Sequence, residues 1–259
     1  MLSVSDHLVH LEGEALARDV NAAEMRALLA AGARCRAPVD GSVYGTLLND
    51  LRALEALGDA MKVTPYKAPP HAPVLYLKPR NTLAGHRAQV TVPGDSGVEA
   101  GASLGVVIGR TATRISAERA FDYIAGYTLV ADLSLPHASV YRPSVRFRAR
   151  DGFCVIGPAV IARRHVTTPD QLGIRVELDG TVFAASTSSC VRGVAQLLAD
   201  VTDFMTLSPG DVITLGVPHG MPVARAGQRA TLSIGDWPAL AIEFVAPTQD
   251  PTAHKGAQP

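Results

Sequence analysis

The stretch Val98-Glu-Ala-Gly-Ala-Ser-Leu-Gly-Val-Val-Ile-Gly109 decides how the chain is interpreted. Its second half is an apolar run with β-branched residues, which predicts a strand over 104–108. Residues two apart on a strand point to the same face, so Glu99, Gly101 and Ser103 share one face. Only Glu99 among these three carries a charge.

Composition excludes several classes of protein. The 259 residues contain 24 Lys and Arg and 24 Asp and Glu, so no overall positive field favours nucleic acid or an anionic membrane. Cys35, Cys154 and Cys190 are scattered, which fits a reducing cytoplasm and argues against a disulfide framework or structural zinc. No signal-peptide pattern and no apolar run near ~18 residues is present. We expect a soluble cytoplasmic protein without nucleic-acid or membrane partners.

The first part of the chain favours helix. Asn21-Ala-Ala-Glu24 has capping-box spacing, and the alanine-rich run after it stops at Gly32. A second short helix is expected over 51–57. We predict a small N-terminal helical segment at 1–40, which the turn Pro38-Val-Asp-Gly41 separates from the main domain.

The main domain, 41–247, has the patterns of strands and one long helix. Asp179-Gly180 joins two strand-like runs as a hairpin turn, and apolar residues at helical spacing form a stripe from Val191 to Met205. The polar residues 248–259 are expected to form a flexible tail. Strands are predicted at 74–77, 89–92, 104–108, 124–130, 174–178, 181–183, 212–215, 230–234 and 240–245. The chain therefore has the pattern of a strand-rich α+β fold.

Six segments occur in an order that resembles the fumarylacetoacetate hydrolase family. The resemblance covers about residues 41 to 246. It implies a mixed β-sheet rolled into a barrel-like structure with few peripheral helices. The segments are 98–109, Leu77-Lys-Pro-Arg-Asn-Thr82, Asp122-Tyr-Ile-Ala-Gly-Tyr-Thr-Leu-Val-Ala-Asp132, Arg148-Ala-Arg-Asp-Gly-Phe-Cys-Val-Ile-Gly-Pro158, 204–213 and Leu215-Gly-Val-Pro-His-Gly220.

Three segments are similar to one branch of that family. They are Thr64-Pro-Tyr-Lys-Ala-Pro-Pro70, Ser134-Leu-Pro-His-Ala-Ser-Val-Tyr-Arg-Pro143 and Arg150-Asp-Gly-Phe-Cys154. The branch is the N-terminal half, or separate first subunit, of the isomerase/decarboxylase of 4-hydroxyphenylacetate (homoprotocatechuate) degradation. The resemblance implies decarboxylation of 5-oxopent-3-ene-1,2,5-tricarboxylate and isomerisation of 2-hydroxyhepta-2,4-diene-1,7-dioate. It also implies a homodimer, or a hetero-oligomer with a second family subunit that carries an intact site.

The resemblance further implies a divalent metal, Mg²⁺ or Mn²⁺, that chelates a 2-oxo acid and stabilises its enolate as a Lewis acid. The family holds this metal with a Glu-x-Glu pair on the strand and with an Asp, which is Asp132 here. Counting back from Gly109, the two Glu positions fall on Gly101 and Ser103. Glu99 lies one step away on the same face, about 6.6 Å along the strand. We expect the metal to be absent or weakly bound.

At other positions, too, this chain lacks residues that the resemblance implies for active members of the family. The resemblance implies a His and a Glu in active members at the positions of Ala53 and Ala56, and a Thr at the position of Val217. Arg148 replaces a Lys; it can bind a carboxylate bidentately, but its pKa is too high for a proton-transfer base. His219 lies alone in a glycine loop, where a histidine is more often a surface residue than a catalyst.

The candidate catalytic residues are Asp132 and Arg148. The candidate substrate-binding residues are Lys78, Arg142 and Arg150, which together with Arg80 and Arg148 would suit a di- or tricarboxylate. Two alternatives stay open: Asp132 hydrogen-bonds loop amides only, and the basic residues are solvated or paired with Asp151.

Three functions follow from these residues. The first is a subunit of the isomerase/decarboxylase with a degenerate metal site, which supports or dimerises with a catalytic second subunit. The second is an independently active hydrolase, isomerase or decarboxylase that holds a metal loosely through Asp132 and Glu99. The third is a non-enzymatic module that binds a small dicarboxylate through its arginines.

Overall fold

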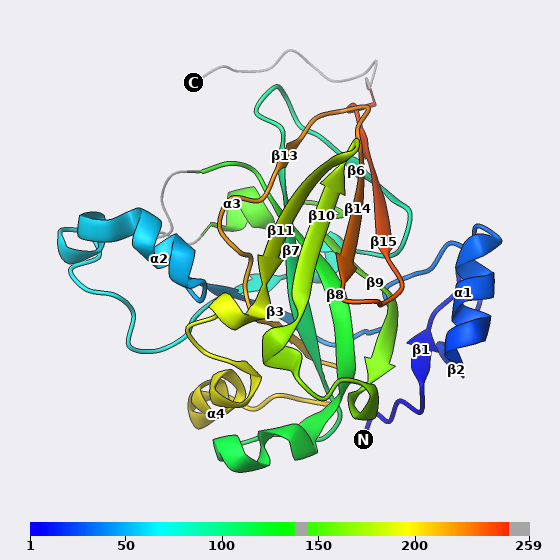
Figure 1. The fold of residues 1–259 in the computed structure, drawn as a ribbon, viewed down its shortest axis with the longest axis horizontal. Coiled ribbons are helices and arrows are strands. Elements are labelled where there is room, and N and C mark those ends of the chain that lie inside the picture. Colours follow the sequence, from blue (N-terminus) through cyan, green and yellow to red (C-terminus); the bar gives the residue numbers. More distant parts are fainter. Residues whose placement is uncertain (138–143, 249–259) are drawn as a thin grey trace.

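Two β-sheets form the frame of the molecule (Figure 1). The computed structural model describes residues 1–137 and 144–248. The larger sheet has ten strands. In spatial order its path runs β2 (Arg18–Val20), β1 (His7–Val9), β9 (Cys154–Ala162), β8 (Ile124–Ser134), β7 (Val98–Ile108), β12 (Val212–Thr214), β3 (Val43–Leu47) and β4 (Val74–Lys78), with β13 (Val223–Ala224) paired to β7 and β5 (Leu83–Ala84) to β9.

The smaller sheet has five strands, and the helices are short. Its order is β11 (Thr181–Ser186), β10 (Gly173–Leu178), β14 (Arg229–Ile234), β15 (Leu240–Val245) and β6 (Ala88–Thr91). The α-helices are α1 (Ala22–Ala30), α2 (Leu51–Leu57), α3 (Val145–Arg148) and α4 (Val194–Phe204), and 3₁₀ turns are η1 (Gly58–Lys62), η2 (Arg80–Thr82), η3 (Ala117–Tyr123), η4 (Arg163–His165), η5 (Pro169–Gln171) and η6 (Thr187–Ser189). Helices α1 and α2 lie on opposite sides of the molecule in Figure 1.

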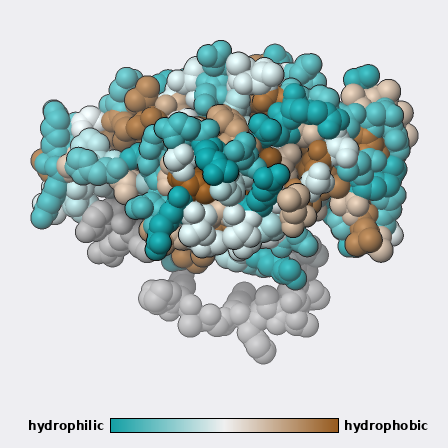
Figure 2. Space-filling view, turned by 90° about the horizontal axis from the view of Figure 1, so that it is seen from below, coloured by the Kyte–Doolittle hydropathy of each residue, from teal (hydrophilic) through white to brown (hydrophobic). Residues whose placement is uncertain are grey.

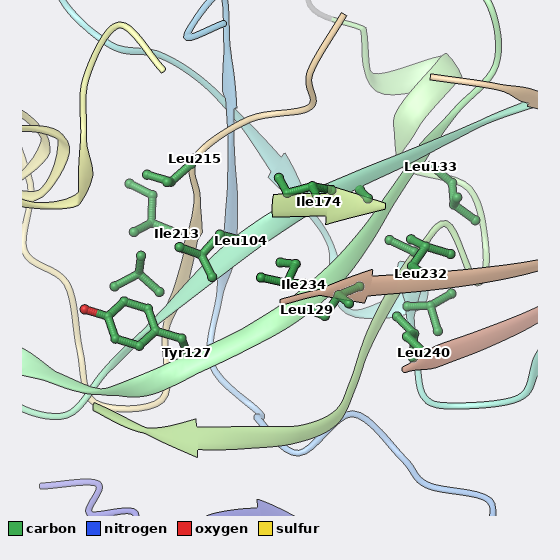
Figure 3. Close-up of a cluster of buried hydrophobic side chains, with 14 of the residues drawn as sticks. Leu104, Tyr127, Leu129, Leu133, Ile174, Ile213, Leu215, Leu232, Ile234 and Leu240 are labelled. Carbon is green, nitrogen blue, oxygen red and sulfur yellow. The ribbon is translucent and has the colours of Figure 1, made fainter. Parts of the chain in front are cut away.

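The main core lies between the two sheets. Leu104 of β7 and Leu129 of β8 belong to the same buried cluster as Ile174, Leu232 and Leu240 of the smaller sheet (Figure 3). Burying these side chains removes apolar surface from water, which is the main stabilising contribution to such a fold. The core fixes β7 and β8, and these two strands carry the candidate site.

The surface has a different character from this interior. Hydrophilic residues cover most of the face in Figure 2, and hydrophobic residues lie between them in separate small patches. Among the described residues, no helix has the length and apolar character needed to cross a membrane.

The strand-rich α+β prediction is confirmed, with one correction. The larger sheet follows an open path, with β2 and β4 at its two ends, so it is not a closed barrel. The predicted strands at 74–77, 89–92, 230–234 and 240–245 correspond to β4, β6, β14 and β15. Strands β7 and β8 each run for 11 residues and extend beyond the predicted ranges.

The N-terminal segment contains strands as well as the predicted helix. Helix α1 begins after Asn21, whose side chain accepts hydrogen bonds from the backbone N–H groups of Ala23 at 3.0 Å and Glu24 at 2.9 Å. However, β1 pairs with β9 and β2 pairs with β1. Residues 1–40 are therefore not only helical, because two of their strands extend the larger sheet. Three-residue strands have too few positions to show an alternating pattern in the sequence.

His86, just before β6, makes stability depend on pH. It is buried, and its Nδ1 accepts a hydrogen bond from the backbone N–H of Ala241 at 3.3 Å, which requires this nitrogen to be unprotonated. Burial, helped by the charge of Arg87, lowers the pKa of His86 from its usual 6.5 to about 4. Between pH 4 and pH 6.5, the His86 imidazole therefore binds a proton in the unfolded chain but not in the folded chain.

We therefore expect the free energy of unfolding to fall by on the order of 1 kcal/mol as the pH drops from 6.5 towards 4. Urea unfolding across this range measures the loss, and the variant His86→Gln should reduce it. The exposed His71 provides the control: His71→Gln should keep the wild-type pH dependence. An unchanged pH dependence in His86→Gln would contradict this assignment.

Candidate functional site

Asp132 lies at the centre of the larger sheet. It belongs to β8 and pairs with Gly101 of β7 on one side and with Cys154 of β9 on the other. Its side chain has an exposed fraction of 0%. A buried carboxylate is costly unless charged or hydrogen-bonding groups surround it. The neighbours of Asp132 therefore define the site.

Lys78, the last residue of β4, is the first neighbour. Its Nζ lies 2.8 Å from Asp132 Oδ1, and its side chain is also fully buried. The same ammonium donates to the backbone carbonyls of Leu133 at 2.7 Å, Arg148 at 3.2 Å and Phe153 at 2.9 Å. An ammonium has three N–H donors, so none is left for a ligand. The structure places Lys78 as a buried counter-ion, in contrast to the substrate-binding role expected from the sequence.

Tyr76, two residues earlier on β4, is the second neighbour. Its hydroxyl donates a hydrogen bond to Asp132 Oδ2. Burial, followed by the nearby charge of Asp132, raises the pKa of the Tyr76 hydroxyl well above its usual range, so the group remains a donor. Its ring fits because the residue opposite on β3 is Gly45, where a Cβ would collide with the ring. Oδ2 of Asp132 thus accepts from Tyr76, whereas the buried Oδ1 lies against the Lys78 ammonium but accepts no hydrogen bond among the described residues.

Arg148, at the end of α3, is the third neighbour and the least well satisfied. Its Nη1 lies 3.7 Å from Asp132 Oδ1 and donates to the Tyr76 hydroxyl at 3.3 Å. The guanidinium also lies over the Tyr76 ring, 4.6 Å from the centroid, as in a cation–π contact. Its side chain is 9% exposed, and within the described residues its buried Nε has no hydrogen-bond partner. Part of the hydrogen-bonding capacity of this cation is unused.

A cavity of about 130 Å³ opens beside this cluster. It is lined by Asp132, Arg148 and Tyr76 together with Glu99 and His219. The lining comes from distant parts of the chain, because Tyr76 belongs to β4, Glu99 to β7, Asp132 to β8 and Arg148 to α3. The two predicted catalytic residues therefore line one cavity.

Neighbouring groups fill the positions of the two missing carboxylates. A Cβ on Gly101 would lie 2.6 Å from the carbonyl oxygen of Asp132 and 2.7 Å from Val217 Cγ1. Ser103 is fully buried, and its hydroxyl donates to the carbonyl of Leu104 at 3.4 Å. Ala53 and Val217, at the predicted His and Thr positions, both line the cavity without a donor or acceptor. The sites of the family's polar groups are thus occupied by apolar or packed atoms.

The donor set does not fit a divalent cation. Mg²⁺ and Mn²⁺ take several oxygen ligands in a regular geometry. Asp132 is the one ligand position retained, and its two oxygens already face Lys78 and Tyr76. In the parts of the chain that the structure describes, no three His, Cys, Asp or Glu side chains gather as metal ligands.

The other predicted binding residues lie away from this cavity or outside the described chain. Arg150 does not line the cavity, and its Nε donates to the carbonyl of Arg146 at 3.2 Å. Arg80 is exposed. Asp151 accepts a hydrogen bond from the side-chain amide of Asn81 at 2.7 Å. Arg142 lies outside the described residues, so its predicted role stays a prediction.

His219 lines the cavity but is exposed, and its backbone N–H donates to Asp50 Oδ1 at 3.2 Å. Asp50 also caps α2 by accepting from the backbone N–H of Ala53 at 3.1 Å. The contact thus links the glycine loop to the start of α2. It positions the loop through the backbone of His219 and does not involve the imidazole.

Comparison with known proteins gives consistent results. The family described as fumarylacetoacetate (FAA) hydrolase C-terminal matches residues 42–245. The 4-hydroxyphenylacetate degradation bifunctional isomerase/decarboxylase of Escherichia coli is 38% identical over 201 residues, which are 77% of this chain and 46% of that protein. The chain spans about half the length of the curated relatives it matches.

Solved structures show the same fold. The 5-carboxymethyl-2-hydroxymuconate delta-isomerase from Mycobacterium smegmatis matches with a TM-score of 0.70 and 27% identity, over 84% of this chain and 82% of that chain. Fumarylpyruvate hydrolase from Pseudomonas aeruginosa, solved in complex with Mn²⁺ and pyruvate, matches with a TM-score of 0.71 and 18% identity, over 95% and 99%. At that identity the second likeness shows the fold alone. The match over residues 42–245 and the 38% identity show that the chain belongs to the fumarylacetoacetate hydrolase family.

Proposed function

We propose that this chain is a supporting subunit, or half, of an isomerase/decarboxylase of 4-hydroxyphenylacetate catabolism, with a degenerate metal site of its own. The identity to the Escherichia coli bifunctional enzyme supports the pathway. The observation that carries the supporting role is that groups of the chain itself lie against the Asp132 carboxylate. The Lys78 ammonium lies beside Oδ1, and the Tyr76 hydroxyl donates to Oδ2.

The chemistry explains why this closure matters. Decarboxylation of a 2-oxo acid or its tautomerisation leaves an enolate, which a chelated metal stabilises as a Lewis acid. This chain offers one engaged carboxylate for that purpose, and Arg148 cannot accept a proton in a catalytic step. The chemical step therefore belongs to a second family subunit with an intact Glu-x-Glu pair, and this chain contributes the contact with it. We place the assembly in the cytoplasm and its substrates among small di- and tricarboxylates.

An activity assay on the purified chain tests this proposal. We expect no decarboxylation of 5-oxopent-3-ene-1,2,5-tricarboxylate by the chain alone, with or without Mg²⁺. When the second subunit is added, we expect turnover that is faster than that of the second subunit by itself. Turnover by the chain alone that Mg²⁺ stimulates and Asp132→Asn abolishes would refute the degenerate site. It would favour an independently active enzyme instead.

A second candidate function has one observation in its favour. The unpartnered Nε of Arg148 beside the cavity fits a module that binds a carboxylate without turnover. Ligand binding without any rate increase in the mixed assay would favour this module over the supporting subunit.

A further inference from the structure

A cavity of about 540 Å³ lies beside β1 and α1, at the side of the molecule that these two elements occupy in Figure 1. It shares no lining residue with the cavity beside Asp132. Its walls come from β1, α1, the end of β9, His165 of η4 and the turn between β14 and β15. Its volume falls within the range of about 300–1,000 Å³ that is typical of small-molecule sites. The N-terminal segment and the smaller sheet thus form a separate space of ligand size.

His7, the first residue of β1, offers a hydrogen-bond acceptor to this cavity. It lines the cavity with an exposed fraction of only 8%, and its Nδ1 lies 2.9 Å from Asp6 Oδ1. An ionised carboxylate only accepts hydrogen bonds, so Nδ1 carries the hydrogen and Nε2 of the neutral ring is an acceptor. Within the described residues this Nε2 has no hydrogen-bond partner. A ligand with a hydroxyl or N–H group can supply the missing donor.

Asp6 lies between two imidazoles. His165 Nε2 lies 3.1 Å from the same Asp6 Oδ1, and the His7 and His165 rings stack with their centroids 6.4 Å apart. Throughout residues 1–137 and 144–248, no three His, Cys, Asp or Glu side chains gather as metal ligands. The polar groups of this cavity therefore suit an organic ligand.

The cavity also contains one cation and one anion that lack partners. Arg26 of α1 and Asp236 of the β14–β15 turn both line it. Neither side chain takes part in an ion pair or a hydrogen bond within the described part of the chain. Both residues are exposed, so their charges remain free to pair with a ligand. Charges of opposite sign on separate walls match a molecule that carries both a carboxylate and an ammonium group.

Trp237 adds an aromatic surface beside Asp236. It lines the cavity and packs against the main hydrophobic core, which restricts the movement of its ring. The next residue, Pro238, has a fixed φ and so stiffens the turn. Leu29 and Ile161 supply further apolar surface, and an indole face stacks well on another planar ring. The cavity therefore favours a ligand with an aromatic ring.

We propose that this cavity binds a free aromatic amino acid with a hydroxyl group on its ring, such as tyrosine. The carboxylate of the ligand pairs with Arg26 and its ammonium group with Asp236. The ring stacks on Trp237, and the ring hydroxyl donates to Nε2 of His7. The inference goes beyond the proposed function and does not rest on it, because the two cavities have no lining residue in common.

Fluorescence of Trp237 measures this binding, because Trp237 is the one tryptophan in the sequence and can be excited beyond the absorption of tyrosine. The full chain is titrated with tyrosine and with three analogues that each lack one group. Tyramine lacks the carboxylate, 3-(4-hydroxyphenyl)propionate lacks the ammonium group and phenylalanine lacks the hydroxyl. We expect tyrosine to change the emission and each analogue to bind about tenfold more weakly, as the loss of one hydrogen bond to the chain predicts.

Three variants assign each group of the ligand to one side chain. Arg26→Met should remove the preference for tyrosine over tyramine, and Asp236→Asn should remove the preference over 3-(4-hydroxyphenyl)propionate. His7→Asn keeps a side-chain N–H donor but has no counterpart of Nε2, so it should bind tyrosine and phenylalanine equally. Arg175, an exposed arginine outside the cavity lining, provides the control. Arg175→Met should keep all three preferences.

Unchanged emission with tyrosine, or equal binding of tyrosine and all three analogues, would overturn the inference. Variants that keep the wild-type preferences would also overturn it, since the ligand would then lie elsewhere. Loss of the expected preference in each variant, with the other two preferences kept, supports the assignment. Because each preference is a ratio measured within one variant, a general loss of stability does not imitate this result.

Discussion

Replacing Lys78 by methionine is expected to destabilise the folded chain by about 3–5 kcal/mol, because the change leaves Asp132 buried without its nearer ion-pair partner and with only Arg148 at 3.7 Å. The carbonyls of Leu133, Arg148 and Phe153 also lose their donor. Methionine keeps most of the volume of the lysine stem, so packing contributes little to this loss. Urea unfolding measures the change as a shift in midpoint at constant slope.

Two further variants test the cause of this loss. The double variant Lys78→Met/Asp132→Asn should be more stable than Lys78→Met alone, since asparagine removes the unpaired charge. Lys62 forms an exposed ion pair with Asp59, so Lys62→Met should cost less than about 1 kcal/mol. If Lys78→Met is as mild as Lys62→Met, the buried ion pair does not hold the site together.

Placing a methyl group on Gly101 is expected to destabilise the chain by about 1–3 kcal/mol, as overpacking of a filled interior does. The new Cβ would lie 2.6 Å from the carbonyl oxygen of Asp132 and 2.7 Å from Val217 Cγ1. The backbone at Asp132 is held in the ladder by β7 and β9, so it has little freedom to move. A glutamate at this position meets the same obstacle.

Gly173 offers a matched control for this substitution. It also lies on a strand, but a Cβ there would have no atom within 4 Å and its φ is not positive. Gly173→Ala should therefore be neutral or slightly stabilising. Equal stability of Gly101→Ala and Gly173→Ala would show that the site can still accept a side chain on β7.

The fold was predictable where the sequence carries a repeating pattern. The apolar stripe predicted α4, whose buried residues include Val194, Leu197 and Val201. The hairpin of β10 and β11 followed from Asp179-Gly180. Strand β9 was not predicted, because it is buried along its whole length and therefore shows no alternation of polar and apolar residues. The open path of the larger sheet depends on pairings between distant segments, which no local pattern reports.

The site was predictable in part. Its two proposed catalytic residues, Asp132 and Arg148, line one cavity. Tyr76 was missed, since a tyrosine on a strand usually signals packing, and its contact with Asp132 depends on Gly45 across the strand pair. The burial of Lys78 was also not foreseeable, because three of its four oxygen partners are backbone carbonyls whose positions only the fold determines.

Titration of the metal-free chain with Mn²⁺, with and without oxalate, tests the central claim that Asp132 is closed to metal. The free Mn²⁺ signal in electron paramagnetic resonance reports the unbound ion directly. The structure predicts that this signal follows the protein-free control throughout, because the Lys78 ammonium lies against Oδ1 of Asp132 and repels a second cation, and Tyr76 donates to Oδ2. Stoichiometric loss of the signal that Asp132→Asn abolishes would contradict it and would return the chain to the metal-dependent members of its family.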